Sequence, residues 1–181
     1  VVGRLSDGKI RKPLAFYRIL EFLAKLQKHT CSKMKVKPTE RISIPMRLEA
    51  YPSDTVFFVP LDYVQRTIAA LYPLPVCNRT YHITGASPVR TKDIEAAVHS
   101  VLKIDGITVQ EKVEDPTEGE LLMKRVIGDL MPYFSSQIIF DTTNVANALG
   151  KENLNWTTGP VFLEKMMSEF YRSNFPDVIE N

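Results

Sequence analysis

The chain has 181 residues, of which 44% are hydrophobic and 24% are charged, a balance that suits one globular domain and excludes a disordered chain. No apolar run approaches the roughly 18 residues of a membrane helix, and Cys31 and Cys77 are too few for a disulfide framework or a Cys-rich zinc site. The net charge of +2 hides an asymmetry, because residues 1–47 hold 12 Lys/Arg against three acidic residues, giving +9 there and −7 in the remainder.

The basic segment, residues 1–47, does not have the pattern of a nucleic-acid-binding surface. Its densest part, Lys25 to Arg47, contains no aromatic side chain to stack on bases and no recognisable reading motif. We interpret most of it as a solvated helix end and loop. The alternative is a surface for an anionic partner or a nucleotide-bearing substrate.

The first third of the chain predicts one helix and one edge strand. Apolar residues recur at helical spacing from Leu14 to Lys28, and Pro13 suits the first turn of that helix. Thr30 to Glu40 is predicted to be a loop. Residues 42–48 then alternate between apolar and polar, and Pro45 within them restricts this strand to the edge of a sheet.

The stretch VFFVPLDYV, residues 56–64, predicts a buried strand that leads directly into a helix. Val56 to Val59 would form the strand, and Pro60 would end its hydrogen-bond ladder. Asp62 stands where an N-cap belongs, and Gln65 completes a D-x-x-Q pattern like a capping box. The acidic residue is therefore interpreted as structural rather than catalytic.

The remaining residues predict further strands and helices joined by short loops. Strands are expected at Thr80–Thr84, Ile107–Val113 and Ser136–Phe140, and helices from a Thr91 cap to Gly106, at Glu118–Met131, from Asp141 to Leu149 and at Val161–Arg172. Pro160 stands where a first-turn proline belongs, and we interpret the aromatic and methionine stripe of the last helix as core packing. This mixture predicts the α/β class (mixed α+β) and a single domain, residues 1–181. Too few strands look buried for a complete doubly wound sheet, so we expect a further segment before residue 1.

Catalytic and metal-binding motifs are not found in the sequence. There is neither a Gly-rich phosphate loop nor a G-x-S-x-G nucleophile elbow, and none of the tyrosines has a lysine four residues later. His29, His82 and His99 stand apart, without metal-ligand spacing. We therefore predict no catalytic residue and no metal site, and we interpret His82 as a structural histidine with a hydrogen-bond partner.

Segments in a fixed order resemble the extended short-chain dehydrogenases/reductases. They are VVGRLSDG at residues 1–8, VPLDYV at 59–64, YHIT at 81–84 with TKDI at 91–94, and FDTTN at 140–144 with ALG at 148–150. The resemblance implies the C-terminal, substrate-binding portion of such an enzyme, lacking its N-terminal Rossmann core. The parent would use NADP or NAD through motifs upstream of residue 1, and this portion alone would bind no cofactor.

Further residues of the chain indicate which branch of this family it resembles. Sugar-nucleotide epimerases and dehydratases often carry an arginine before the strand where this chain has Thr55-Val56-Phe57. Three features resemble instead the thioester-reductase or male-sterility type: the motif VPLDYV, the basic segment, and the helix that contains FLEKMM. The resemblance thus implies the substrate-binding half of an NAD(P)H-dependent reductase acting on acyl thioesters, carried on coenzyme A or on an acyl or peptidyl carrier protein.

Two alternatives stay open: a non-catalytic module that binds a carrier protein, and the C-terminal half of a sugar-nucleotide epimerase or dehydratase. We expect a cytoplasmic protein with no membrane or nucleic-acid partner. The candidate substrate-binding residues are Gly3 and Arg4 on the first turn, Leu14 and Tyr17 on the first helix, and Arg47 and Phe57 near the second strand.

Overall fold

A computed structural model describes residues 1–181 except 76, 86, 135–137, 155, 157, 180 and 181. The helices are α1 (Phe16–Met34), α2 (Leu61–Leu71), α3 (Thr91–Leu102), α4 (Glu118–Ile127), α5 (Met131–Phe134), α6 (Thr143–Leu149) and α7 (Pro160–Asn174), with short 3₁₀ turns η1 (Lys151–Leu154) and η2 (Pro176–Val178). The strands are β1 (Ile42–Glu49), β2 (Thr55–Val56), β3 (Val89–Arg90) and β4 (Ile104–Gln110). Helices and strands are mixed, as the sequence predicts for the α/β class in its general sense.

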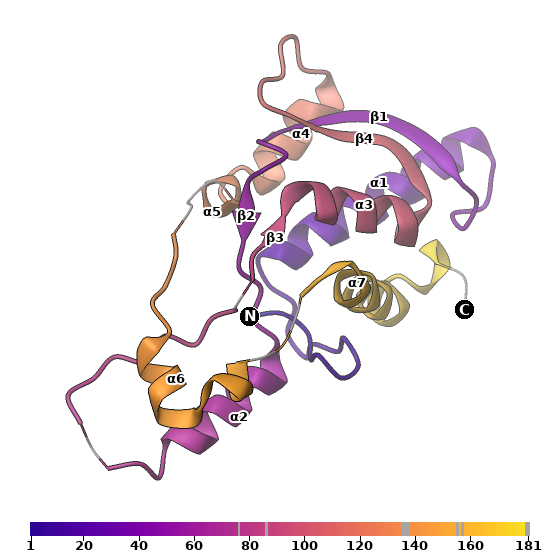
Figure 1. The fold of residues 1–181 in the computed structure, drawn as a ribbon. Coiled ribbons are helices and arrows are strands. Elements are labelled where there is room, and N and C mark those ends of the chain that lie inside the picture. The colour runs from indigo at the N-terminus through magenta and orange to yellow at the C-terminus, as the bar shows by residue number, and fades with distance from the viewer. Residues whose placement is uncertain (76, 86, 135–137, 155, 157, 180–181) are drawn as a thin grey trace.

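The described strands form two small sheets (Figure 1). β1 and β4 are parallel, with Ile42 opposite Ile104 and Glu49 opposite Gln110, whereas β2 and β3 pair antiparallel. The β1–β4 register shifts between Ser43 and Met46, around Pro45, as expected where proline cannot donate to the ladder. The predicted edge strand is therefore confirmed, but β4 begins and ends three residues before the predicted 107–113.

The core lies where α3 packs between β4 and α7. Helix α7 begins at Pro160 in its first turn, as predicted, and its apolar stripe is buried to 5% exposure or less, at Phe162, Leu163, Met166, Met167 and Phe170. The interpretation of this stripe as core packing is confirmed. The stripe fixes α7 against the rest of the chain through apolar burial, the main favourable term in folding.

Helix α1 begins and ends later than its hydrophobic pattern predicts. It starts at Phe16 because Ala15 has a φ of 46°, and it runs to Met34 through part of the predicted loop 30–40. Cys31 is fully buried, and the fully buried Gln27 donates to the carbonyls of Pro38 and Leu102 at 2.7 Å each. These tertiary contacts hold the last turns helical, which local spacing could not indicate.

Several predicted strands do not form. Residues 80–84 are not in a strand, and β2 covers only the beginning of the predicted strand Val56–Val59. Of the predicted strand Ser136–Phe140, residues 136 and 137 lie outside the described residues and 138–140 are not in a strand. Short apolar runs predict burial better than they predict a ladder, because a strand also needs a partner.

Two predicted helices differ at their ends. Arg90 rather than Thr91 is the N-cap of α3, and the Thr91 hydroxyl donates instead to the carbonyl of Asp54 at 3.1 Å. The predicted helix Glu118–Met131 is interrupted, because α4 ends at Ile127 and α5 begins at Met131. Gly128 lies in the break, where a Cβ would overlap the carbonyl oxygen of Lys124.

Asp62 is not the N-cap of α2, which is Pro60. Its carboxylate instead accepts hydrogen bonds from the backbone N–H groups of Leu5 at 2.9 Å and Ser6 at 3.3 Å. Burial alone would raise the pKa of Asp62, but these donors and the N–H of Tyr63 outweigh it and lower the pKa. The capping-box prediction was wrong. Asp62 has a structural role, but it stabilises a long-range contact between α2 and the first turn of the chain.

We expect Asp62→Ala to lower the free energy of unfolding by about 1–2 kcal/mol, because hydrogen bonds to a charged group are lost. Urea unfolding would measure the loss, and amide hydrogen exchange should show reduced protection at Leu5 and Ser6. Gln65→Ala is the matched control, since Gln65 is exposed on the same helix. An equal loss of unfolding free energy in Gln65→Ala would contradict this role of Asp62 and would support the capping box instead.

Candidate functional site

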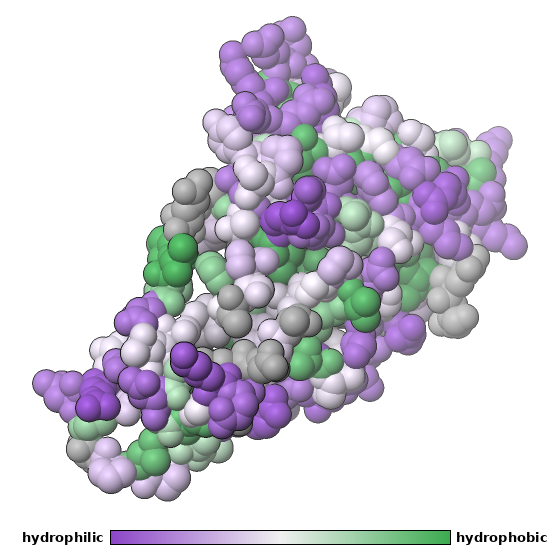
Figure 2. Space-filling model, in the orientation of Figure 1, coloured by the Kyte–Doolittle hydropathy of each residue, from purple (hydrophilic) through white to green (hydrophobic). Residues whose placement is uncertain are grey.

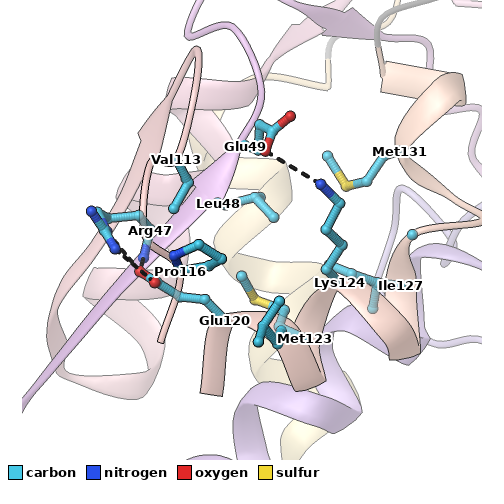
Figure 3. Close-up of a pocket in the computed structure, with 12 residues that line it drawn as sticks. Arg47, Leu48, Glu49, Val113, Pro116, Glu120, Met123, Lys124, Ile127 and Met131 are labelled. Atoms are coloured by element: carbon cyan, nitrogen blue, oxygen red, sulfur yellow. Dashed lines mark hydrogen bonds and ion pairs between the residues drawn. The ribbon is translucent and has the colours of Figure 1, made fainter. Parts of the chain in front are cut away.

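Arg47 on β1 and Glu120 on α4 form a paired ionic contact at one end of a cavity (Figure 3). Arg47 donates through Nε and Nη2 to the two carboxylate oxygens of Glu120 at 2.8 Å each, and its backbone N–H donates to the same carboxylate at 2.7 Å. The Glu120 side chain is only 4% exposed, and the Arg47 guanidinium also donates to the carbonyls of Glu114 and Asp115. All these contacts fasten the loop before α4 to β1.

Local sequence explains why Glu120 lies there. Thr117 and Glu120 form a capping box at the start of α4, in which Thr117 N–H donates to Glu120 at 2.8 Å and Glu120 N–H donates to the Thr117 hydroxyl at 3.3 Å. The hydrogen bond from Arg47 is the main reason why the pKa of Glu120 is held far below its usual range. Arg47 is therefore fully engaged and has little capacity to grip a substrate.

Apolar side chains form the floor of this first cavity, whose volume is about 190 Å³. Leu48, Met123, Ile127 and Met131 face it in Figure 3, and the pair Lys124–Glu49 (3.4 Å) lies at its side. An interior of this chemistry accepts hydrocarbon and offers charge only at its rim.

Two further cavities continue from the first toward the start of the chain. A middle cavity of about 40 Å³ shares Leu48 and Met131 with the first cavity. A third, of about 220 Å³, shares Phe16 and Phe134 with the middle one. These shared side chains separate neighbouring cavities, and the row follows α5 from Arg47 to Phe57. We name the row of three cavities the α5 channel.

The third cavity brings together two of the predicted substrate-binding residues, Leu14 and Phe57. Leu14 is 62% exposed, whereas Phe57 is partly buried, so the cavity has an open side at Leu14. Its lining is almost wholly hydrocarbon and aromatic: Val1, Val2, Leu14, Ala15, Phe16, Val56, Phe57, Phe58, Leu130, Tyr133 and Phe134. Arg47 lies at the opposite end of the same channel.

Gly3, Arg4 and Tyr17 do not line the channel in the structure. The Tyr17 hydroxyl accepts a hydrogen bond from the Gly3 N–H at 2.8 Å, and burial raises the pKa of Tyr17 to about 12 despite that bond. A Cβ on Gly3 would overlap the carbonyl oxygen of Gly8. Arg4 pairs with Asp7. These residues shape and anchor the first turn of the chain, and they bear on the channel only through the position of that turn.

Charge differs between the two ends of the channel. Arg11 and Lys12 are exposed and have no ion pair among the described residues, and the chain reaches Leu14 at the third cavity two residues later. The loop before α4, at the first cavity, carries Glu111, Glu114 and Asp115 against one cation, Lys112, and forms the hydrophilic projection at the top of Figure 2. An anionic group would therefore be favoured at the Leu14 end.

Most of the basic segment is engaged in ion pairs rather than presented as one cationic surface. Seven of its cationic side chains meet a carboxylate: Arg4, Lys9, Arg18, Lys25, Lys28, Arg41 and Arg47. Five of the seven carboxylates lie outside residues 1–47, so folding offsets five of the nine net positive charges. Among the described residues, Arg11 and Lys12 have no ion pair, and the same is true of Lys33, Lys35 and Lys37 near the end of α1.

The predicted site did not include Leu48, Met131 or Phe134, which separate the three cavities. Their apolar character gave no signal beyond burial. Glu120 was also missed, although the T-x-x-E spacing of Thr117 and Glu120 is a capping-box signature that sequence alone displays.

A separate, more polar cavity of about 420 Å³ lies beside α2. Its lining includes Arg66, Glu152 and the mutually tilted rings of Tyr63 and Trp156, whose centroids are 4.9 Å apart. None of the six predicted residues lines it. It therefore does not share the chemistry expected of the candidate site.

His82 and the two cysteines have unexceptional environments. His82 Nδ1 lies 2.9 Å from the carbonyl oxygen of Asp141, which confirms a structural partner, although His82 is not in the predicted strand. Cys31 is a buried free thiol and Cys77 an exposed one. Within the described residues, no group of three or more His, Cys, Asp or Glu side chains could hold a metal ion.

Comparison with known proteins returned no matching family model, curated protein or solved structure. None of the helices in the described part of the chain has the length and apolar content needed to cross a bilayer.

Proposed function

We propose that the chain is the substrate-binding portion of an NAD(P)H-dependent reductase that acts on acyl thioesters. The observation that carries the proposal is the α5 channel, a row of apolar cavities between Arg47 and Phe57. An acyl group is a flexible hydrocarbon chain, and burial of each methylene is worth about 0.8 kcal/mol. The channel supplies apolar walls along the direction such a chain would take.

The charge distribution supports a thioester rather than a free fatty acid as the substrate class. Coenzyme A and carrier proteins present the acyl group on a phosphate-bearing arm. Arg11 and Lys12 are exposed and precede Leu14, which lines the third cavity, by three and two residues, and we assign to them the attraction of that phosphate. The phosphate would then lie at the Leu14 end, away from the acidic loop before α4, and the acyl chain would extend inward along the channel.

The chain's own residues would bind and orient the substrate rather than perform the reduction. The sequence contains neither a Gly-rich phosphate loop nor a Tyr-x-x-x-Lys pair, so these residues do not fit a dinucleotide. The proposal therefore assigns NADP or NAD, and the hydride it supplies, to another portion of the parent enzyme. The role left to this chain is the hydrophobic grip on the acyl group.

We expect octanoyl-phosphopantetheine to bind the chain saturably in isothermal titration calorimetry. Phe57→Ala should weaken that binding about tenfold. Full burial of a phenylalanine side chain is worth about 1.5–3 kcal/mol, and the partly buried Phe57 contributes about 1.4 kcal/mol, which corresponds to a factor of ten in the dissociation constant. Tyr72→Ala is the control, since Tyr72 is 89% exposed and lies outside the channel lining. The control should bind like the parent chain.

Two other ligands separate the proposal from its alternatives. Tight binding of a UDP-sugar, with none of the acyl thioester, would favour the epimerase or dehydratase half and overturn the proposal. Binding of a phosphopantetheinylated carrier protein regardless of acylation would favour a carrier-binding module and overturn it as well. Phe57→Ala would leave the affinity unchanged in both cases.

A further inference from the structure

We propose that Met131 determines the length of acyl chain that the α5 channel accepts. The inference rests on the proposed function, and it adds a specificity-determining residue to that site. Met131 and Leu48 are the two side chains common to the middle cavity of about 40 Å³ and the first cavity of about 190 Å³. Along the row of cavities, these two side chains lie between the end at Leu14 and the space beside Arg47.

Two pairs of side chains, here called the first and second walls, separate the three cavities of the channel. Phe16 and Phe134 stand between the third cavity of about 220 Å³ and the middle one. Met131 and Leu48 stand deeper, so short acyl groups would be held before they reach this second wall. Longer acyl groups bury more methylenes only if a side chain of the second wall moves aside. The second wall therefore decides whether added methylenes contribute to affinity.

Of the two side chains in the second wall, Met131 has more freedom to move. Leu48 lies on β1 and is fixed by its register with Val109 on β4. Met131 begins the four-residue helix α5, directly after the break at Gly128, and its backbone N–H makes a 3.3 Å bond to the Gly128 carbonyl. Its side chain is unbranched and partly buried, and methionine adapts readily to neighbouring shapes.

The first cavity gives the passing chain a defined end. Arg47–Glu120 and Lys124–Glu49 flank its apolar floor in Figure 3. A hydrocarbon terminus that reached these charges would have to desolvate them, at a cost that burial of one more methylene does not offset. Chain length is thus limited first at Met131 and finally at this charged rim.

The test measures dissociation constants for phosphopantetheine thioesters from butyryl to hexadecanoyl. Met131→Ala should shift the length at which affinity stops improving toward longer chains, with a gain of about fourfold per additional buried methylene. Met131→Trp should lose that affinity for the longer thioesters while the shortest bind as before. Met131→Leu, which conserves volume, should keep the parent profile.

Met34→Ala is a matched control, because Met34 is 53% exposed at the end of α1 and lies outside the channel lining. Unchanged binding of butyryl thioester would show that each variant is folded. One length profile shared by all the Met131 variants would overturn the inference while leaving the proposed function intact. Failure of every thioester to bind the parent chain would overturn both.

Discussion

Glu120→Ala should lower the free energy of unfolding by about 3 kcal/mol, because removal of one partner from a buried ion pair leaves the other uncompensated. Glu120 accepts hydrogen bonds from the Arg47 side chain and backbone and from the Thr117 N–H. The substitution therefore also removes half of the capping box of α4. Urea unfolding followed by circular dichroism would measure the loss.

The same ion pair predicts a pH dependence whose sign follows from the pKa of Glu120. The folded-state pKa is lowered from an ordinary value of 4.5, so the unfolded chain binds the proton more readily. The stabilisation is fully present above the unfolded-state pKa and is lost as the pH falls through the folded-state pKa. The difference between the parent and Glu120→Gln should accordingly be largest above about pH 5 and should narrow on acidification.

Glu118→Ala provides the control for Glu120, because Glu118 is exposed in the same first turn of α4. We expect a change within about 0.5 kcal/mol. A loss in Glu118→Ala as large as that in Glu120→Ala would show that charge near the helix N-terminus, rather than the contact with Arg47, stabilises this region. A difference between parent and Glu120→Gln that did not change with pH would contradict the ion-pair account.

Leu163→Ala should be of similar severity, with a loss of about 3 kcal/mol, because it opens a cavity in the close-packed core. Leu163 has no exposed surface, and it belongs to the stripe of α7, the helix that packs against α3. Leucine-to-alanine changes at such sites lose the transfer free energy of the side chain and the contacts around the space left behind. Thermal and urea unfolding would report the loss.

Val161→Ala, in the first turn of α7, is the matched control, since Val161 is 78% exposed. Its unfolding free energy should stay within about 0.5 kcal/mol of the parent. Equal effects of the two substitutions would mean that helix propensity, not burial, governs this helix. A large loss in Leu163→Ala with little change in Val161→Ala would show that the buried face of α7 contributes most of its stabilisation.

The six candidate residues illustrate what the resemblance could and could not predict about the site. Leu14 and Phe57 line the third cavity and Arg47 the first, so three of the six lie on the α5 channel. Gly3 and Tyr17 bond to each other within the first turn and helix. Their proximity to the site in sequence gave no information about where their polar atoms would point.

The sequence by itself determined the elements whose signals are local. The periodicity of α7 and its first-turn proline gave both its place and its buried face, and alternation gave β1. Hydrophobic spacing succeeds there because burial of one face repeats with the geometry of the element. No partner far along the chain is needed to recognise it.

Tertiary structure alone decided which polar groups meet and where cavities remain. Asp62 contacts Leu5 and Ser6 across more than fifty residues, and Arg47 meets Glu120 across 73 residues. The α5 channel arises because β1, α1, α3, α4, α5 and the residues in and just after β2 pack without filling the space between them. Such contacts depend on the path of the whole chain, and no local pattern encodes them.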